Sequence, residues 1–328
     1  MLVNDRPRRP LLEPGSMLGD CLSLTVMAPS LHNSQPWLFR LRQGGLDVYA
    51  DVGRQLTVTD PTGREMWISV GAALFNLRVA LAYRGRTPLL RLRPVPAAEL
   101  LAARVSLGPP APVSATVRAL ARAIHRRHSI RWPFDDLAVP NGILAELTAA
   151  AAAEGAVLRP AGPNLRTQVL AVTREAEQRW RPDPDYRREL AEWTFDVPDR
   201  RDGIPRLATG PRSANDALPL RDFGLLRPAA QRSSAKFEAR PTIAVLYTGD
   251  SPRHWLQAGQ ALQRVLLSAT ARGLSSSLLT QPLEIPQLRD GLTDPASGRP
   301  AQAIVRLGYS RRIGAFTPRR PLHDVLLA

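Results

Sequence analysis

Cysteine and lysine are almost missing from this 328-residue chain, which has one of each, Cys21 and Lys236. A single cysteine excludes a disulfide within the chain and cannot by itself form a thiolate metal cluster. No run of apolar residues approaches the roughly 18 that a membrane-spanning helix needs, so we expect no membrane segment. Residues 1–9 lack a following apolar stretch, which argues against a signal peptide. These absences predict a cytoplasmic protein.

Negative charge is scarce relative to positive charge. Lysine and arginine number 44 against 29 aspartates and glutamates, which gives a net charge of +15 and an isoelectric point near 11.3. Such a charge suggests a nucleic acid or an anionic membrane as partner. The basic residues are nearly all arginines, however, and they are scattered, without the interleaved aromatics or motifs of a nucleic-acid-binding module. We therefore expect no nucleic-acid partner, while a small anionic ligand stays open.

An internal repeat organises the chain. Residues 67–85 read WISVGAALFNLRVALAYRG and residues 255–273 read WLQAGQALQRVLLSATARG, and the two segments align without a gap. Each has the apolar periodicity of a long helix and ends at a glycine suited to a left-handed C-terminal cap. Chance similarity between two Ala/Leu-rich helices is the alternative. Matching flanks favour a duplication, with half one at 1–114 and half two at 115–328. The identical pairs are Trp67/Trp255, Gly71/Gly259, Ala73/Ala261, Leu74/Leu262, Arg84/Arg272 and Gly85/Gly273.

The remaining patterns predict shorter elements around these two helices. Segment 180–240 is rich in Pro, Arg, Asp and Gly with weak periodicity, so it is either disordered or a functional lid. Its aromatic residues Trp180, Trp193, Phe195 and Phe223 favour a packed lid. The predicted elements are helices at 17–27 (capped by Ser16), 114–127 and 141–153, a hairpin at 39–49 turning at Gly44–Gly45, and strands at 104–108, 156–159, 242–246 and 305–308.

The decapeptide APSLHNSQPW at residues 28–37 is the most informative motif. Pro29 ends a helix, and the following Ser, Asn and Pro residues fix a compact turn that leads into a strand. Such a turn presents small polar side chains and free backbone groups at one place, which suits a planar polar ligand. A simple helix-to-strand connector, with Asn and Ser capping local backbone groups, explains the same pattern.

This motif resembles the APSxxNxQPW signature of the nitroreductase superfamily of flavoproteins, which bind FMN at a dimer interface. The segment RHSIR at 127–131, followed by Pro133-Phe134, resembles the family's R-x-S-x-[RK]-x-F motif, and TPRRPLHDV at 317–325 resembles its C-terminal R-x-P-L-x-x-V motif. The resemblance implies an α+β, nitroreductase-like fold. It is nearest to the Acg-type branch of single-chain members with one flavin and a lid.

The distribution of the motifs implies a fused dimer. The family draws the arginine motifs from one subunit and the PSxxNxQPW turn from its partner, whereas here they lie in half two and half one of one chain. Neither half carries the complementary copy. The resemblance therefore implies an intrachain pseudo-dimer that binds one FMN and is a monomer.

Carried over from the family, eleven residues form the expected flavin site. Arg127, Ser129 and Arg319 would bind the phosphate and ribityl chain, since arginine offers bidentate bonds to phosphate oxygens. Arg131 would lie at the pyrimidine edge of the ring, where a cation stabilises the reduced flavin. In an arginine-rich chain, Arg127 and Arg131 are also explained as solvated helix-end residues. The expected cofactor-binding set is Pro29, Ser30, Leu31, Asn33, Arg127, His128, Ser129, Arg131, Thr280, Gln281 and Arg319, with a backbone N–H at 280–281 facing flavin N5 and no separate role given to His128.

The resemblance implies an FMN-dependent oxidoreductase that takes hydride from NAD(P)H and passes electrons to a nitroaromatic or quinone-like acceptor. Positioning and electrostatics dominate such chemistry, so no catalytic side chain is required. The sequence has no HExxH, CxxC, Walker or GxGxxG motif, and we expect no metal site. The alternative is a closed FMN-binding protein with little turnover, in which the 180–240 segment covers the flavin.

Overall fold

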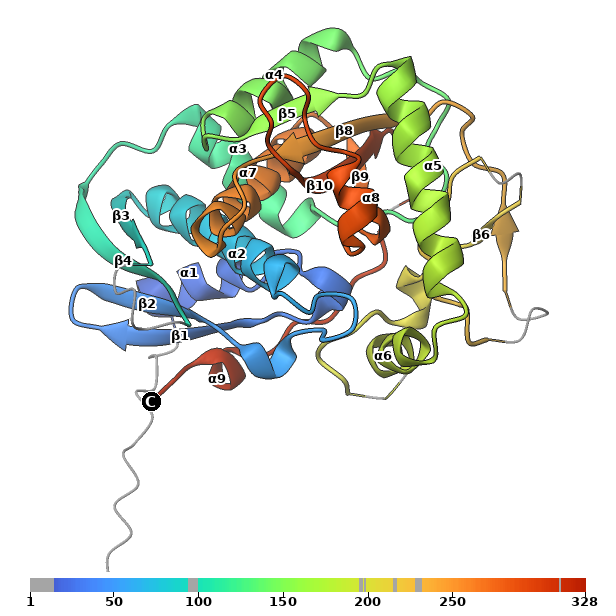
Figure 1. Cartoon of the computed structure of the whole chain (residues 1–328). Coiled ribbons are helices and arrows are strands. Elements are labelled where there is room, and N and C mark those ends of the chain that lie inside the picture. Colours follow the sequence, from blue (N-terminus) through green and yellow to red (C-terminus); the bar gives the residue numbers. More distant parts are fainter. Residues whose placement is uncertain are drawn as a thin grey trace, which may run out of the picture.

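Two antiparallel sheets with a pair of long helices between them form the body of the protein (Figure 1). This architecture comes from a computed structural model that describes residues 15–93, 100–194, 197, 199–214, 217–227, 232–312 and 314–328. The helices are α2 (Arg64–Tyr83) and α7 (Pro252–Ala271), the two members of the predicted repeat. The mixed α+β architecture agrees with the expected fold class.

Sheet one has the strand order β1-β2-β4-β3. A tight hairpin joins β1 to β2, with Gly44 at a φ of +73° as its left-handed turn residue. The predicted hairpin and the strand predicted at 104–108 are confirmed, whereas β3 has no predicted counterpart. The strands are β1 (Trp37–Arg42), β2 (Gly45–Ala50), β3 (Arg86–Leu92) and β4 (Leu101–Pro110).

Sheet two has the order β5-β8-β10-β9, which is the same arrangement when its strands are numbered in chain order. In both sheets the long helix connects the second strand to the third. β10 is buried along its whole length because helices cover both faces of this sheet. The strands are β5 (Val157–Pro160), β8 (Thr242–Tyr247), β9 (Ser275–Leu278) and β10 (Ala301–Gly308), of which β9 is not predicted.

Helices α2 and α7 cross where the two repeated glycines meet. A Cβ atom built on Gly259 would lie 1.9 Å from the carbonyl oxygen of Ile68 and 2.8 Å from the Cα of Gly71. Only glycine allows backbones to approach this closely. The helices end at Gly85 and Gly273, which have φ values of +69° and +77°, as the predicted left-handed caps require.

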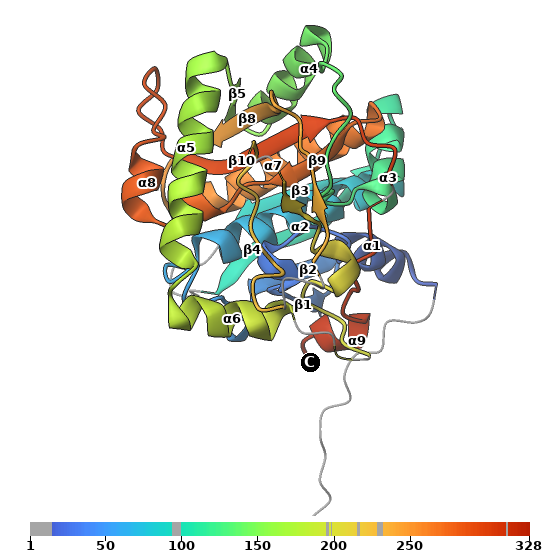
Figure 2. The ribbon, with the colours of Figure 1, turned by 90° about the vertical axis from the view of Figure 1, so that its right-hand side faces the viewer.

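Shorter helices cover the outside of this pair. Helix α5 lies against the face of sheet two opposite α7, as the view in Figure 2 shows, and was not predicted. The three predicted helices are present with ends shifted by one or two residues, and the hydroxyl of Ser16 caps the first by accepting from Gly19 N. The helices are α1 (Met17–Thr25), α3 (Ala115–Arg126), α4 (Asn141–Ala152) and α5 (Pro163–Trp180).

Segment 180–240 contains one helix of eleven residues and otherwise only short elements, although its periodicity is weak. Helix α6 (Pro184–Thr194) buries Tyr186, Leu190 and Trp193, and the two-residue strands β6 (Arg212–Ser213) and β7 (Ser234–Ala235) pair in parallel. Apolar side chains spaced three to four residues apart drive the helix despite its many charges. Phe195 lies outside the described residues.

The C-terminal segment returns from sheet two to sheet one. Helices η5 (Gln281–Leu283) and α8 (Pro286–Asp290) lead into β10, and α9 (Leu322–Val325) follows it. Leu327 N then donates to the carbonyl oxygen of Phe39 at 2.7 Å, so the end of the chain lies against β1. This crossing brings the C-terminal arginine motif to the 28–37 turn.

Helix α2 corrects the expectation that no segment is long and apolar enough to cross a membrane. It meets that criterion by length and composition. Its apolar window is 83% buried, however, which is the pattern of a core helix.

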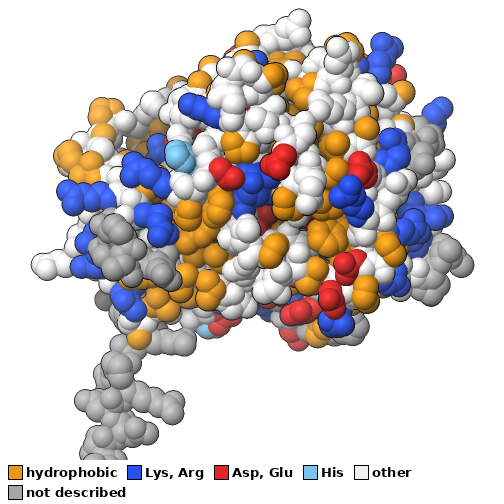
Figure 3. Space-filling model, viewed as in Figure 1, with side chains coloured by type: hydrophobic (Ala, Val, Ile, Leu, Met, Phe, Trp, Pro, Cys, Tyr) orange, Lys and Arg blue, Asp and Glu red, His pale blue; other side chains and the backbone are white. Residues whose placement is uncertain are grey.

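On the face in Figure 3, basic side chains lie at several separate places with acidic and hydrophobic ones between them.

Candidate functional site

The 28–37 turn has strained backbone geometry. His32, Asn33 and Gln35 have φ values of +48°, +58° and +53°, a region that residues other than glycine rarely adopt. Such strain persists where the surroundings fix it, and it concentrates at functional sites. The hydroxyl of Ser30 stabilises the turn by accepting from Gln35 N at 2.9 Å. The backbone conformation of this turn is therefore fixed by local hydrogen bonds and by its surroundings.

The side chains of the turn hold two distant segments. Asn33 Nδ2 donates to the carbonyl oxygens of Gly203 and Pro318, both at 3.0 Å. Gln35 Nε2 donates to the Arg201 carbonyl oxygen at 2.9 Å, and its Oε1 accepts from Arg320 N at 2.8 Å. The turn therefore joins the 180–240 segment to the C-terminal segment.

A pocket opens beside this turn. Six of the eleven predicted site residues line it, and they come from both halves of the sequence. The rest of the lining comes from the turn, α2, α7, β9 and the 180–240 segment. The predicted lining residues are Pro29, Ser30, Leu31, Ser129, Arg131 and Thr280, and the others are His32, Glu65, Ile68, Ser69, Ala72, Arg221, Phe223, Leu262 and Leu278.

Arg127, which is buried, and Arg319, which is half-buried, are two cations without a carboxylate partner in the described part of the chain. Burial lowers the pKa of Arg127 to about 10, and its Nε atom has no hydrogen-bond partner among the described residues. Burial, together with the charge of Arg127, lowers the pKa of Arg319 to about 9. Buried charges are normally paired, so this pair has the donor set for an anion such as phosphate.

Neutral groups orient the Arg319 side chain. Its Nη1 donates to Asn33 Oδ1 at 3.0 Å and to Thr317 Oγ1 at 2.8 Å, and its Nη2 donates to the Met27 carbonyl oxygen at 3.3 Å. These acceptors fix the guanidinium without neutralising its charge. The predicted residues Asn33 and Arg319 are thus in contact, Arg127 lies near enough for its charge to act on Arg319, and none of the three is in the pocket lining.

Arg131 lies at the boundary with the 180–240 segment. Burial and the nearby Arg221 lower its pKa to about 10, and its Nη1 donates to the Ala208 carbonyl oxygen at 2.8 Å. Its guanidinium carbon lies 4.6 Å from the centroid of the Phe223 ring, a cation–π distance. Arg221 differs from Arg131 because it forms an ion pair with the buried Glu284 and donates to Thr280 Oγ1 at 3.1 Å.

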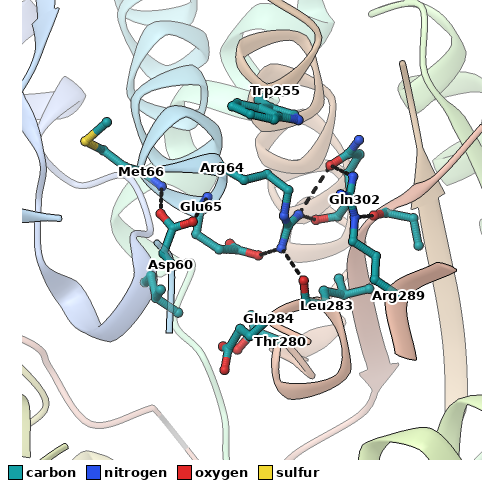
Figure 4. A network of polar contacts seen from close by, with 12 residues as sticks. Asp60, Arg64, Glu65, Met66, Trp255, Thr280, Leu283, Glu284, Arg289 and Gln302 are labelled. Atoms are coloured by element: carbon teal, nitrogen blue, oxygen red, sulfur yellow. Dashed lines mark hydrogen bonds and ion pairs between the residues drawn. The ribbon is translucent and has the colours of Figure 1, made fainter. Parts of the chain in front are cut away.

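Glu65 brings a carboxyl group to the pocket from the first turn of α2. It forms an ion pair with Arg64, which also donates to the carbonyl oxygen of Gln302 at 3.0 Å (Figure 4). Burial raises the pKa of Glu65 despite the charge of Arg64. Asp60 caps the same turn by accepting from Glu65 N and Met66 N at 3.0 and 2.8 Å. Sequence reasoning missed Glu65, although a charge at the start of an otherwise apolar helix marks it.

His32 is the most unusual polar group in the pocket lining. It is 3% exposed, and neither ring nitrogen has a hydrogen-bond partner among the described residues. Burial, with Arg221 and Arg131 nearby, lowers its pKa well below the ordinary value, so the ring is neutral. Its centroid lies 5.4 Å from that of Phe223, with the two rings nearly perpendicular.

Other candidates lie apart from the pocket lining. Gln281 is buried, and its Nε2 donates to the Pro219 carbonyl oxygen at 3.3 Å. His128 is half-buried, and burial with Arg127 and Arg319 nearby lowers its pKa. Arg320 is held by Asp51 at 3.4 Å. No cluster of potential metal ligands occurs within the described ranges, and Cys21 is buried in the core.

Comparisons with known proteins show which family and which relatives this chain is similar to. A model of the nitroreductase family matches residues 124–309. Two Mycobacterium tuberculosis proteins that are provisionally named as NAD(P)H nitroreductases are similar to this chain. The first, Rv3131, is 35% identical, and the match covers 93% of this chain and 89% of the relative. The second, acg, is 31% identical, and the match covers 94% of this chain and 95% of the relative.

Among solved structures, the FMN-dependent nitroreductase NfnB of Mycobacterium smegmatis in complex with NADPH is 16% identical, with a TM-score of 0.39, and the match covers 63% of this chain and 96% of NfnB. The family model spans more than half of the described chain, and the identity to the curated relatives exceeds 30% over nearly all of it. The predicted α+β, nitroreductase-like fold class is confirmed. This chain belongs to the nitroreductase family.

Proposed function

We propose that the protein is an FMN-dependent oxidoreductase that uses NAD(P)H and reduces a nitroaromatic or quinone-like acceptor. The observation that carries this proposal is the Arg127–Arg319 pair, one buried and one half-buried guanidinium group without a carboxylate partner among the described residues, at the seam of the molecule. A flavin phosphate would supply the missing negative charge. Family membership and the NAD(P)H nitroreductase names of the relatives support the same cofactor and reductant.

The chain's own residues would bind and orient the cofactor. Arg127 and Arg319 would hold the phosphate, with Ser129 on the ribityl side and Pro29, Ser30 and Leu31 against the ring. Arg131, a buried cation without a carboxylate partner among the described residues, would stabilise negative charge at the pyrimidine edge. Bound FMN supplies the hydride- and electron-transfer chemistry. The roles of His128, Thr280 and Gln281 stay predictions.

We further propose that the chain is an intrachain pseudo-dimer of duplicated halves, 1–114 and 115–328, with one FMN per monomer. Two observations support it. The sheets share one strand order with the long helix at the same place. Gly71 and Gly259, equivalent in the repeat, meet at the helix crossing, as equivalent residues do at a two-fold axis. The segment 161–241 stands where half one has only its β1–β2 hairpin turn.

A closed FMN-binding protein with little turnover is the second candidate, because the 180–240 segment covers the pocket. Arg221 and Phe223 of this segment line the pocket directly. The carboxylate of Glu189 on α6 fastens the segment to half one by accepting from Val58 N at 2.8 Å and from Thr59 N at 3.1 Å. An incoming nicotinamide ring would have to displace Arg221 and Phe223 from the pocket lining.

Anaerobic reduction separates the two candidates. The protein is loaded with FMN, freed of unbound flavin, and mixed with NADH or NADPH while the flavin absorbance is followed. Prompt bleaching, restored by an added quinone, supports the oxidoreductase. Intact absorbance with FMN still bound supports the closed binder. A chain that retains no FMN after denaturation and reconstitution contradicts both.

Stoichiometry and mass test the pseudo-dimer. We expect one FMN released per chain and a monomeric mass in light scattering at low protein concentration. Two FMN per chain, or FMN bound only by a dimer, contradicts this proposal and leaves the cofactor assignment standing.

A further inference from the structure

We propose that His32 is the hydrogen-bonding contact of the pocket for a negatively polarised oxygen on an aromatic acceptor, and that Phe223 occupies the position of that acceptor's ring. This inference rests on the proposed function, because it names the substrate chemistry of the same pocket. It adds His32 of the 28–37 turn as a positioning residue, and it proposes that Phe223 of the 180–240 segment fills the acceptor position when no acceptor is bound.

The first step is the unmet hydrogen-bonding capacity of His32. A neutral imidazole has one N–H donor and one acceptor nitrogen. Both nitrogens of His32 are buried and have no partner in the part of the chain that the structure describes. Buried polar groups in native proteins are nearly always satisfied. The ring lines the pocket that we assign to the flavin, and we propose that its partner is an acceptor bound beside that flavin.

The second step is the identity of the group that covers His32. Phe223 meets the imidazole nearly perpendicularly, with centroids 5.4 Å apart, and presents its ring to Arg131 at 4.6 Å. The phenyl ring has no polar atom, so it satisfies neither nitrogen. It does show that the space between His32 and Arg131 accepts a six-membered aromatic ring.

The third step is the charge around that ring position. Arg131 and Arg221 both line the pocket, and Arg221 also lies within 6.0 Å of the Phe223 centroid. Arg221 is paired with Glu284, so the unpaired guanidinium of Arg131 and an imidazole N–H are the groups that favour an oxygen with negative charge, such as that of a nitro, quinone or carboxylate group. An aromatic ring with such an oxygen would reproduce the ring contacts of Phe223 and supply the missing hydrogen bond.

Binding of 4-nitrobenzoate to the oxidised, FMN-loaded protein tests the proposal, since oxidised flavin leaves this probe unreduced. Calorimetry gives the dissociation constant. We expect His32→Phe, which keeps a ring and removes both nitrogens, to weaken binding ~10-fold, the loss of one hydrogen bond. We expect Phe223→Ala to tighten binding severalfold, because the probe no longer competes with that side chain.

Matched variants control for general effects. His323→Phe and Phe316→Ala change the same residue types at exposed positions, where the side chain of His323 is 72% exposed and Phe316 is 65% exposed. Both should bind the probe as the parent does. Because phenylalanine is strained at a φ of +48°, His32→Asn is the second variant at that position: asparagine tolerates the left-handed region, and its shorter side chain should also weaken binding.

Histidine NMR provides a readout that needs no turnover. The chain has five histidines, so the signal lost in His32→Phe or His32→Asn identifies His32. We expect a neutral ring whose nitrogen shifts change when 4-nitrobenzoate is added. Unchanged affinity in both His32 variants, or equal or weaker binding by Phe223→Ala, would overturn the proposal. FMN content is measured separately. A chain that binds no FMN contradicts the proposed function, and the dissociation constants of the flavin-free parent and variants for 4-nitrobenzoate then test this inference.

Discussion

Two kinds of buried arginine occur in this protein, and they differ in what lies opposite the charge. Arg306 on β10 is fully buried, and its Nε and Nη2 donate to the carboxylate of Glu238 at 2.6 and 2.8 Å. Arg127 is also buried, and Arg319 is half-buried with a buried Nε atom, yet no carboxylate lies within ion-pair distance of either in the described residues. The first kind completes the fold, and the second kind leaves positive charge for a ligand to neutralise.

Arg221 lies between these extremes and clarifies the difference. It lines the same pocket as Arg131 but pairs with Glu284, and this partner with Tyr186 and Glu177 raises its pKa although burial alone lowers it. For Arg131, burial is the main influence and its pKa falls. Proximity to the pocket therefore does not by itself mark an arginine as a proposed ligand site, and the proposed site residues differ from Arg221 in lacking a counter-charge among the described residues.

Replacing Arg306 gives the largest expected effect. In Arg306→Met, the carboxylate of Glu238 is left buried without its cation, and we expect a loss of ~3–5 kcal/mol in the free energy of unfolding. Urea unfolding of the flavin-free protein measures it. A loss below 1 kcal/mol would erase the distinction between the two kinds of arginine.

The same substitution at the seam should act on the ligand and spare the fold. We expect Arg127→Met and Arg319→Met to weaken FMN binding ~10- to 100-fold, the range for one charge-assisted hydrogen bond. Because no charged partner is stranded, Arg127→Met should unfold at the same urea concentration as the parent without FMN, or at a higher one. Flavin fluorescence quenching gives the affinity. Equal FMN affinity in the parent and both variants contradicts the site assignment.

The pKa of His128 should respond to the unpaired charges of Arg127 and Arg319. Burial is the main cause of its lowered pKa, and Arg127 and Arg319 lower it further. Removing Arg127 or adding FMN should therefore raise that pKa, as followed by histidine NMR. Arg306→Met, which removes a neutralised cation, should leave it unchanged. A pKa of His128 that FMN does not move would place the phosphate elsewhere.

A smaller effect concerns stability below neutral pH. His32 and His128 titrate below their ordinary value of 6.5 in the folded chain, so just below pH 6.5 the unfolded chain binds protons that the folded chain does not. These two histidines should therefore lower stability as the pH drops from 6.5 toward the folded pKa values, whereas Asp60, whose pKa burial raises to about 7, contributes with the opposite sign. Urea unfolding of the parent and of His32→Phe between pH 5 and 7 isolates the contribution of His32, and the variant should lose less stability, or gain more, than the parent as the pH falls.

The smallest effect is expected at an exposed pair. Arg84 and Asp20 form a salt bridge with both side chains over 40% exposed, and such pairs contribute little because water screens them. Arg84→Met should change the free energy of unfolding by about 0.5 kcal/mol or less and leave FMN affinity intact. A flavin loss equal to that of Arg127→Met would show that binding follows overall charge.

Much of the fold could be predicted because its signals are local. The repeat of α2 and α7, their glycine caps and the Gly44 hairpin follow from periodicity and from the φ values that only glycine adopts easily. Strands β3 and β9 and helix α5 escaped prediction, because proline, serine and charged residues in them weaken the pattern and tertiary contacts stabilise the elements instead.

The residues of the candidate site also fall into those that a local sequence motif indicates and those that only tertiary contacts bring to the pocket. The motifs at 28–37, 127–131 and 317–325 pointed to most of the residues that meet at the seam. Glu65, Arg221 and Phe223 carried no motif, since each becomes part of the pocket only through the placement of a helix or of the 180–240 segment. His32 stood in a recognised motif, but its two unsatisfied nitrogens depend on what packs around it.

The sequence by itself determined which residues are cations, where the glycines permit turns and close helix contacts, and which motifs the chain shares with its family. Only the tertiary structure decided which arginines are neutralised, because pairing depends on whether a carboxylate from a distant segment arrives within a few ångströms. Arg306 and Arg127 look alike in a chain with so many arginines. Folding brings Glu238 to the first and no carboxylate of the described residues to the second.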